Sequence, residues 1–240
     1  LANFKNIQER CQQSNATLVA VSKIKPIADI LALYSASQRD FGENYVQELV
    51  DKQARLPADI RWHFIGHLQS NKVKYIAPFV HLIHGVDSLK LLKEISRQGQ
   101  KNSRVINCLL QVFIATEETK FGLDESELEE IIQAVQNDPT AFSHVSIRGL
   151  MGMGSFSDDL TLVRNEFKML KALFDSRKNS IPAQPWDILS MGMSGDFAIA
   201  IEEGATMVRV GSCPWRSRMR WPSLCAMSRC ASRAARGVKL

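Results

Sequence analysis

The sequence predicts a single α/β domain, a (β/α)8 TIM barrel, from two observations. Apolar runs of strand length alternate with amphipathic stretches of helix length, and several of these runs are apolar on both faces. Such strands are typical of a parallel sheet covered by helices, and eight strand–helix units close most economically into a barrel. An open doubly wound sheet is the alternative. It needs a glycine-rich phosphate loop after the first strand, where this chain has SKIKP instead.

Strand-length runs cover residues 17–22, 39–43, 61–66, 80–86, 105–114, 145–153, 186–193 and 206–211. The first seven each precede a segment with apolar residues near i, i+3 and i+4, which indicates helices at 27–37, 46–56, 71–77, 88–99, 125–137, 159–178 and 196–204. Ser88 and Asp124 are expected to begin helices, and Gly99 and Gly204 to end two of them.

The composition excludes several classes of protein. At 240 residues and 45% hydrophobic, the chain can bury a substantial core. It contains no apolar run of about 18–20 residues and no signal-peptide pattern, so we expect no membrane association. The five cysteines are odd in number and lack C-x-x-C spacing, which argues against a disulfide framework or a zinc site and indicates a cytoplasmic location.

The basic charge lies in one segment. The net charge is +5, but residues 213–240 contain seven basic residues and no acidic one. Of the 30 basic residues, 23 therefore remain in residues 1–212 against 25 acidic ones, a net charge of −2. Nucleic-acid binding through the basic segment is one alternative function, but the first 212 residues give no support for it.

Lys23 raises a question of chemistry. It follows the apolar run TLVAVS, and Pro26 prevents that strand from continuing. A lysine there either reaches solvent or is held inside for chemistry, where a neutral amine is the nucleophile that Schiff-base formation needs. Barrel enzymes place their chemistry at the C-terminal ends of strands, which is where Lys23 stands.

A second group of residues follows the last two strands. Ser194 and Gly195 begin a predicted helix whose free N–H groups favour an anion, and Gly211 and Ser212 follow the last strand. Loops at these places commonly hold phosphate in barrels. Arg209 alternates with two valines, so it is expected to point into the barrel, where a buried arginine needs an acceptor.

The histidines do not form a convincing metal site. His63 and His67 are separated by a strand end and a glycine turn, and His81 and His84 are expected on opposite faces of a strand. With no carboxylate nearby in the sequence to complete a ligand set, we predict no metal.

These segments together resemble the pyridoxal-phosphate homeostasis proteins, whose barrel is of the alanine racemase N-terminal domain type. The resemblance is carried, in order, by AVSKIKP, FGENYVQEL, WHFIGHLQSNKVK, GVDS, RGLMGM and SMGMSGDFAIAIEEGATMVRVGS, and it ends at Ser212. It implies a protein that holds pyridoxal 5′-phosphate (PLP) and regulates vitamin B6 in the cell.

The resemblance also assigns roles to residues. Lys23 would form the Schiff base with PLP, Arg209 would face the pyridine nitrogen, and the phosphate would be held by Ser194, Gly195, Gly211 and Ser212. Asn44 would lie beside the ring and Met151 would pack near it, with Ser190 and Met193 lining the site.

The family is regarded as a PLP carrier without established catalysis, so we expect no amino-acid turnover. PLP and PLP-dependent apo-enzymes are the expected partners, and the protein is expected to be a monomer. A PLP-dependent amino-acid racemase or decarboxylase is the alternative. A racemase of this type needs a tyrosine from a second, β-rich domain, for which the sequence shows no segment.

The sequence departs from the family pattern at both ends. Leu1 stands inside the expected first helix, so further residues are expected before it. After Ser212 the family sequence does not continue, which divides the chain into a PLP-binding barrel (1–212) and a basic tail (213–240). The abrupt change of composition is interpreted as a shifted reading frame or a sequence artefact.

Overall fold

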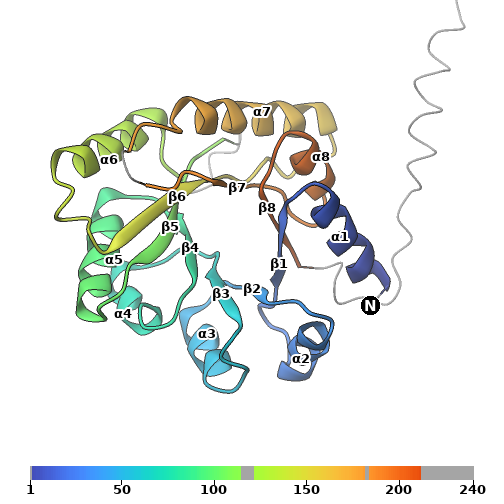
Figure 1. Ribbon diagram of the computed structural model, residues 1–240. Coiled ribbons are helices and arrows are strands. Elements are labelled where there is room, and N and C mark those ends of the chain that lie inside the picture. Colours follow the sequence, from blue (N-terminus) through green and yellow to red (C-terminus); the bar gives the residue numbers. More distant parts are fainter. Residues whose placement is uncertain (1, 115–121, 182–183, 212–240) are drawn as a thin grey trace, which may run out of the picture.

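Eight parallel strands form a closed barrel in which each strand pairs with the next and β8 pairs with β1 (Figure 1). The computed structural model describes residues 2–114, 122–181 and 184–211. The strands are β1 (Thr17–Val21), β2 (Asp40–Glu43), β3 (Arg61–Phe64), β4 (Leu82–Val86), β5 (Ile106–Gln111), β6 (Val145–Met151), β7 (Ile188–Ser190) and β8 (Met207–Val210).

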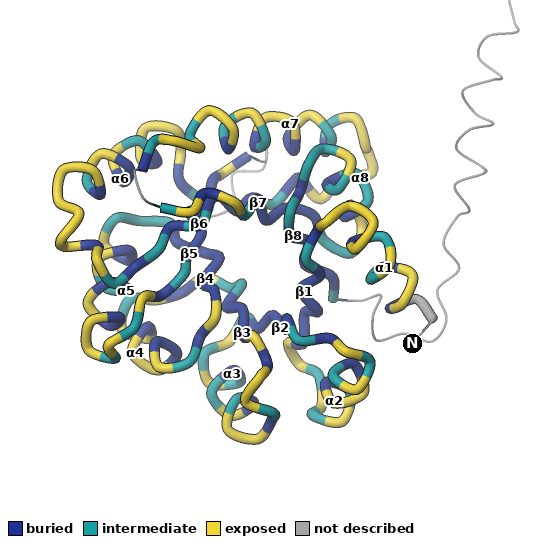
Figure 2. Tube along the Cα trace, in the orientation of Figure 1, coloured by how far each residue is buried: buried dark blue, intermediate teal, exposed yellow. Residues whose placement is uncertain are grey.

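Helices surround the barrel with their exposed faces outward (Figure 2). Before β1 comes α1 (Ala2–Gln13), and the others follow the strands in turn: α2 (Ile27–Ser35), α3 (Val46–Gln53), α4 (Val73–Ile76) with the preceding 3-10 turn η1 (Ser70–Lys72), α5 (Leu89–Lys101), α6 (Glu125–Asn137), α7 (Leu160–Ser176) and α8 (Phe197–Glu202). Among these described helices, none is both long enough and apolar enough to cross a membrane.

The predicted (β/α)8 barrel is confirmed, with every predicted strand present but shortened. The largest difference is at β7, which has three residues where the apolar run has eight. Gly192 follows it with a φ of +90°, and a side chain there would meet the Cβ of Ala200 at 2.5 Å. The backbone therefore leaves the sheet early in order to reach α8.

The helix ends follow from local chemistry. The Ser88 side chain accepts from the Leu91 N–H, and Asp124 forms a capping box with Glu127. The expectation that Gly99 ends a helix is wrong, because α5 continues to Lys101. Gly99 instead allows close packing, since a Cβ atom there would lie 2.5 Å from the carbonyl oxygen of His144.

Two apolar layers hold the barrel together. The larger one lies between the strands and the helices, and the smaller one fills the barrel interior with Val19, Leu82, Leu109, Met151 and Met207. The interior is therefore a packed core at mid-height, with space for ligands only at its ends.

Candidate functional site

A cavity of about 450 Å³ opens at the C-terminal ends of the strands. That volume is within the usual range for small-molecule sites. Its walls come from six of the eight strands or the loops that follow them, and they consist of Val21, Lys23, Lys25, Asn44, Ile65, Met153, Met193, Ser194, Arg209 and Gly211. Six predicted site residues are therefore brought together here, although they are up to 188 positions apart in the sequence.

Lys23 is exposed and lies in a turn, two residues beyond the end of β1. Of the two possibilities raised by the sequence, the solvent-reaching position is thus the one observed. No other described residue bonds to its side chain, and it lines the cavity, so its amine is available to a ligand there.

The turn that carries Lys23 is anchored on both sides. Before it, the carbonyl oxygen of Ser22 accepts from Lys52 Nζ at 2.7 Å. After it, the N–H of Ile24 donates to Glu48 Oε1 at 2.7 Å, and this same oxygen accepts from Lys52 at 2.6 Å. Ile24 has a φ of +61°, which is unfavourable for a β-branched residue and persists only where neighbouring contacts impose it.

Beneath this turn lies a buried carboxylate, Glu43. Its Oε1 accepts from Ser22 Oγ at 2.5 Å and from Lys52 Nζ at 2.8 Å, while its Oε2 is buried without a hydrogen-bond partner. Burial raises the pKa of Glu43, and the bonds from Lys52 and Ser22 oppose that shift only in part. Lys52 is therefore the cation that holds this group of residues together.

Arg209 forms the inner wall of the cavity. Its guanidinium donates to the Ser190 carbonyl at 3.0 Å, to Ser190 Oγ at 2.6 Å and to the Gly152 carbonyl at 3.1 Å. Burial lowers its pKa to about 10, against the opposing charge of Asp196, so it stays protonated at neutral pH. Its bonded partners are neutral, which leaves a buried positive charge facing the cavity.

The Ser194 hydroxyl accepts from the N–H of Gly211 at 3.0 Å. Two polar groups from the loops after β7 and β8 are thereby side by side at the rim of the cavity. Gly195 is exposed, with nothing within 4 Å of the position a Cβ atom would take, and it is not part of the cavity wall. Ser212 lies outside the described residues.

Asn44 is positioned by close backbone packing. It follows β2, and a Cβ atom at residue 66 would lie only 2.5 Å from the Asn44 carbonyl oxygen. Gly66 therefore lets the loop after β3 press directly against the backbone of Asn44.

Two predicted site residues lie deeper than expected. Met151 is 1% exposed and packs inside the barrel with Val19 and Leu82, whereas Met153, two residues beyond the end of β6, lines the cavity. Ser190 is completely buried below Arg209, which it binds. Neither residue lines the cavity, because each is one layer below it, and the expectation that Ser190 lines the site is corrected. That Met151 packs near the ring stays a prediction.

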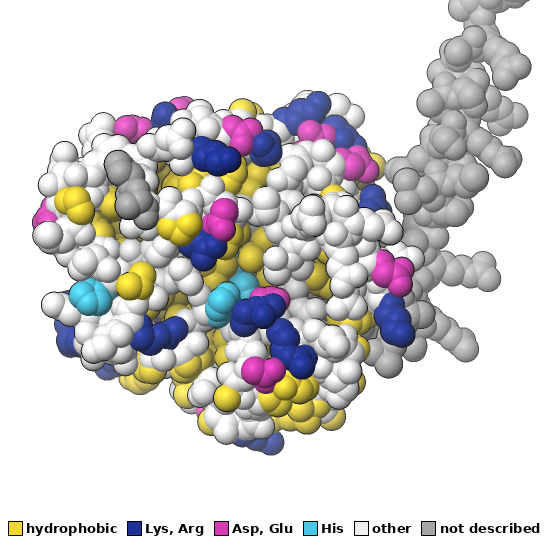
Figure 3. Space-filling model, in the orientation of Figure 1, with side chains coloured by type: hydrophobic (Ala, Val, Ile, Leu, Met, Phe, Trp, Pro, Cys, Tyr) yellow, Lys and Arg dark blue, Asp and Glu magenta, His cyan; other side chains and the backbone are white. Residues whose placement is uncertain are grey.

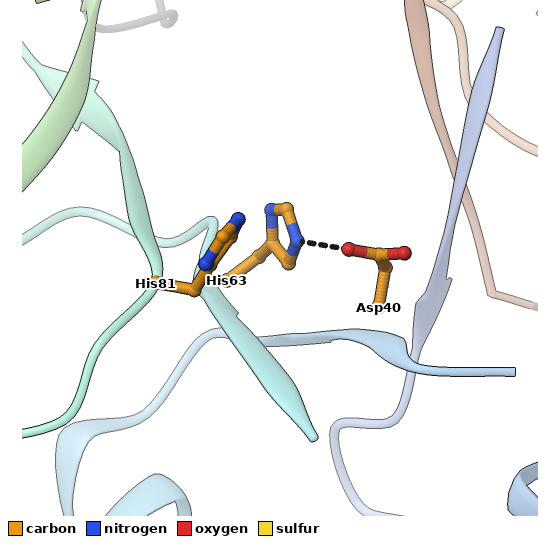
Figure 4. Close-up of side chains that lie close together, drawn as sticks. All are labelled: Asp40, His63 and His81. Atoms are coloured by element: carbon orange, nitrogen blue, oxygen red, sulfur yellow. Dashed lines mark hydrogen bonds and ion pairs between the residues drawn. The ribbon is translucent and has the colours of Figure 1, made fainter. Parts of the chain in front are cut away.

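At the opposite end of the barrel, Asp40, His63 and His81 lie close together, with a ligand atom of each within 4.8 Å of the others (Figure 4). The sequence reasoning missed this carboxylate, which is 23 residues from His63. In the structure Arg61 already binds both oxygens of Asp40, at 2.7 and 2.5 Å. The guanidinium of Arg61 is thus the cation beside Asp40. That the protein has no metal site stays a prediction.

The sequence of residues 1–215 matches the family model described as alanine racemase, N-terminal domain. The chain belongs to this family. Among curated members, the pyridoxal phosphate homeostasis protein of Pasteurella multocida is 38% identical over 224 residues, which are 89% of this chain and 94% of that protein.

Solved structures in the family agree with the geometry. PipY of Synechococcus elongatus without PLP is 33% identical, with a TM-score of 0.83 over 90% of this chain and 99% of PipY. The same protein with PLP bound has a TM-score of 0.78, with 33% identity over 89% of this chain and all of that one. The resemblance noted from the sequence is therefore confirmed at the level of family and fold.

Proposed function

We propose that this chain binds pyridoxal 5′-phosphate in the cavity at the C-terminal end of the barrel and serves the homeostasis of PLP. Relatives that are 38% identical carry that function in their names, and PipY has been solved with PLP bound. The observation that carries the proposal is a single cavity with the amine of Lys23 on one wall and the charge of Arg209 on another.

The residues present fit the cofactor. Lys23 holds the PLP aldehyde carbon as a Schiff base, since its amine has no competing partner among the described residues. Ser194 and the backbone of Gly211 hold the phosphate at the rim of the cavity. The backbone of Gly195, next to Ser194 in the chain, and Ser212 are further contacts. The apolar side chains of Val21, Ile65, Met153 and Met193 pack against the ring.

Arg209 decides what the bound cofactor can do. PLP supplies an electron-accepting ring when its pyridine nitrogen is protonated. An arginine beside that nitrogen is always protonated and can only donate, so it favours the unprotonated ring. Arg209 thus makes the site suited to holding PLP rather than to amino-acid turnover.

The wider role follows from this chemistry. A carrier that holds PLP through a reversible bond can release it to PLP-dependent apo-enzymes, which we propose as the partners of a monomer in the cytoplasm. Residues 1–212 form the PLP-binding unit, and the basic segment 213–240 takes no part in binding PLP.

The test is a titration of the apo-protein with PLP, followed by visible absorbance. The unmodified chain is expected to develop the band of a protein-bound Schiff base at about one equivalent, and Lys23→Ala is expected to lack it. A band of equal intensity in Lys23→Ala would overturn the proposal.

A further inference from the structure

A continuous line of hydrogen bonds crosses the barrel interior from the cavity to the opposite end. Arg209 Nη1 donates to Ser190 Oγ at 2.6 Å, and Ser190 Oγ lies 3.1 Å from His84 Nδ1. His84 Nε2 lies 2.9 Å from His63 Nδ1, and His63 Nε2 lies 3.0 Å from Asp40 Oδ1. All five residues are buried, with exposures from 0 to 7%.

The residues at the two ends of this line determine the direction in which its hydrogen bonds are donated. Arginine can only donate hydrogen bonds, and an ionised carboxylate can only accept them. Burial acts to raise the pKa of Asp40, but the bonds from Arg61 and His63 outweigh burial and hold the pKa well below its ordinary value. Asp40 is therefore ionised at neutral pH and is the acceptor at the end of the line.

The middle of the line has one neutral arrangement that satisfies every bond. Burial lowers the pKa of His84 well below its ordinary value, so it carries one proton. Ser190 then donates to His84 Nδ1, His84 donates from Nε2 to His63 Nδ1, and His63 donates from Nε2 to Asp40. In this arrangement the lone pairs of Ser190 Oγ remain free to accept from Arg209. If the direction of donation were reversed, His84 would also donate to Ser190 Oγ, and Arg209 would share that oxygen with it.

The far end of the line opens into a second, polar cavity of about 370 Å³ at the N-terminal ends of the strands. Its walls include Asp40 with Arg61 and also a separate ion pair, Arg148 with Asp187, joined at 2.8 and 2.5 Å. Near the centre of Figure 3 a histidine side chain lies beside basic and acidic ones. The described residues at this end thus include two arginine–aspartate contacts, of which the one at the buried Asp40 continues to Arg209 and the one at the more exposed Asp187 does not.

We propose that Ser190, His84, His63 and Asp40 form a relay that positions Arg209 against the PLP ring from the opposite end of the barrel. The inference rests on the proposed function, because Arg209 matters to PLP only if PLP binds in the cavity. These four residues are positioning residues, and none of them lines the cavity that holds Lys23.

The test compares Asp40→Asn with Asp187→Asn. Each variant replaces a carboxylate that pairs with an arginine on the wall of the same cavity. Of the two carboxylates, Asp40 is the one at the end of the relay. An amide can donate as well as accept, so Asp40→Asn allows the line to reverse and weakens the bond between Ser190 and Arg209. Asp40→Asn is expected to displace the visible maximum of bound PLP and to raise its Kd roughly three- to tenfold.

Asp187→Asn is expected to change neither the visible maximum nor the Kd. The relay is overturned if the two variants are both folded and indistinguishable in these measurements. If the unmodified chain itself binds no PLP, the proposed function has failed, and the relay is then judged by a second measurement that needs no cofactor.

That measurement is nitrogen-15 NMR of the histidine rings in the apo-protein at neutral pH. His84 is expected as a neutral ring with the proton on Nε2. The relay requires His63 to have a bare Nδ1, which accepts from His84, and a proton on Nε2, which it donates to Asp40. An Nδ1–H form or a doubly protonated ring at either residue would overturn the direction of the relay, whatever the variants do.

Discussion

The Nζ atom of Lys52 lies 2.7 Å from the carbonyl oxygen of Ser22, the residue directly before Lys23. Lys52 is on α3 and Lys23 is in the turn after β1, so the contact joins two neighbouring units of the barrel. It also brings a cation to Glu43 and Glu48, at 2.8 and 2.6 Å. The position of the proposed PLP-binding lysine therefore depends on a second lysine that does not line the cavity.

Lys52→Met is expected to lower the free energy of unfolding by roughly 3 kcal/mol, because it leaves the buried Glu43 without its cation. It is also expected to weaken PLP binding, since the turn that carries Lys23 loses an anchor. Urea unfolding and a PLP titration measure the two effects.

Lys171→Met is the control for this variant. Lys171 pairs with Asp175 on the surface of α7, where both side chains are at least 36% exposed. An exposed pair of this kind is expected to contribute less than about 1 kcal/mol. Equal losses of stability in the two variants would contradict the role given to Lys52.

Ser194→Ala tests the phosphate site. The hydroxyl lies beside the Gly211 N–H, and a hydrogen bond to a charged group is worth about 1.5–3 kcal/mol. The Kd for PLP is therefore expected to rise roughly tenfold or more. The Kd for pyridoxal, which has the same ring and aldehyde but no phosphate, is expected to stay unchanged.

Ser143→Ala serves as the matched serine control, because the partners of the Ser143 hydroxyl among the described residues, Thr140 and His144, lie in its own turn. A Ser194→Ala variant that loses affinity for pyridoxal as much as for PLP would show that Ser194 does not contact the phosphate.

The basic tail is tested by a chain that ends at Ser212. Because residues 213–240 contain all of the excess positive charge, any retention on DNA is expected to be weak, to fall steeply with salt and to disappear on truncation. PLP binding and the melting temperature are expected to be retained. A truncated chain that is folded but no longer binds PLP would contradict the division of the chain at residue 212.

The sequence predicted the barrel and the inward direction of Arg209, because both follow from apolar alternation. Arg209 points inward because its two valine neighbours pack toward the helices, as the alternation indicated. The expectation that His81 and His84 lie on opposite faces of a strand is wrong, because His81 precedes β4 and both imidazole rings lie against that of His63.

How far along the barrel axis each side chain lies was not predictable from the sequence. Met151 and Met153 have the same parity, and only the end of β6 at Met151 places one in the core and the other on the cavity wall.

Contacts between distant segments were not predictable either. The exposure of Lys23 depends on where β1 stops, and that turn is anchored by Glu48 and Lys52, which lie on a different helix. The line from Arg209 to Asp40 joins residues of five strands, so it forms only when the register of these strands is set. One signal was present in the sequence, because His84 is the one polar side chain in the strand LIHGV.

The identity of the lysine that binds PLP is the central claim, and borohydride trapping followed by peptide mass spectrometry tests it most directly. Reduction of the PLP-loaded protein is expected to give one modified peptide with the pyridoxyl group on Lys23. Lys25→Ala is expected to keep this adduct, although Lys25 lines the same cavity, and Lys23→Ala is expected to lose it. A principal adduct on Lys25, or on any lysine other than Lys23, would contradict the claim.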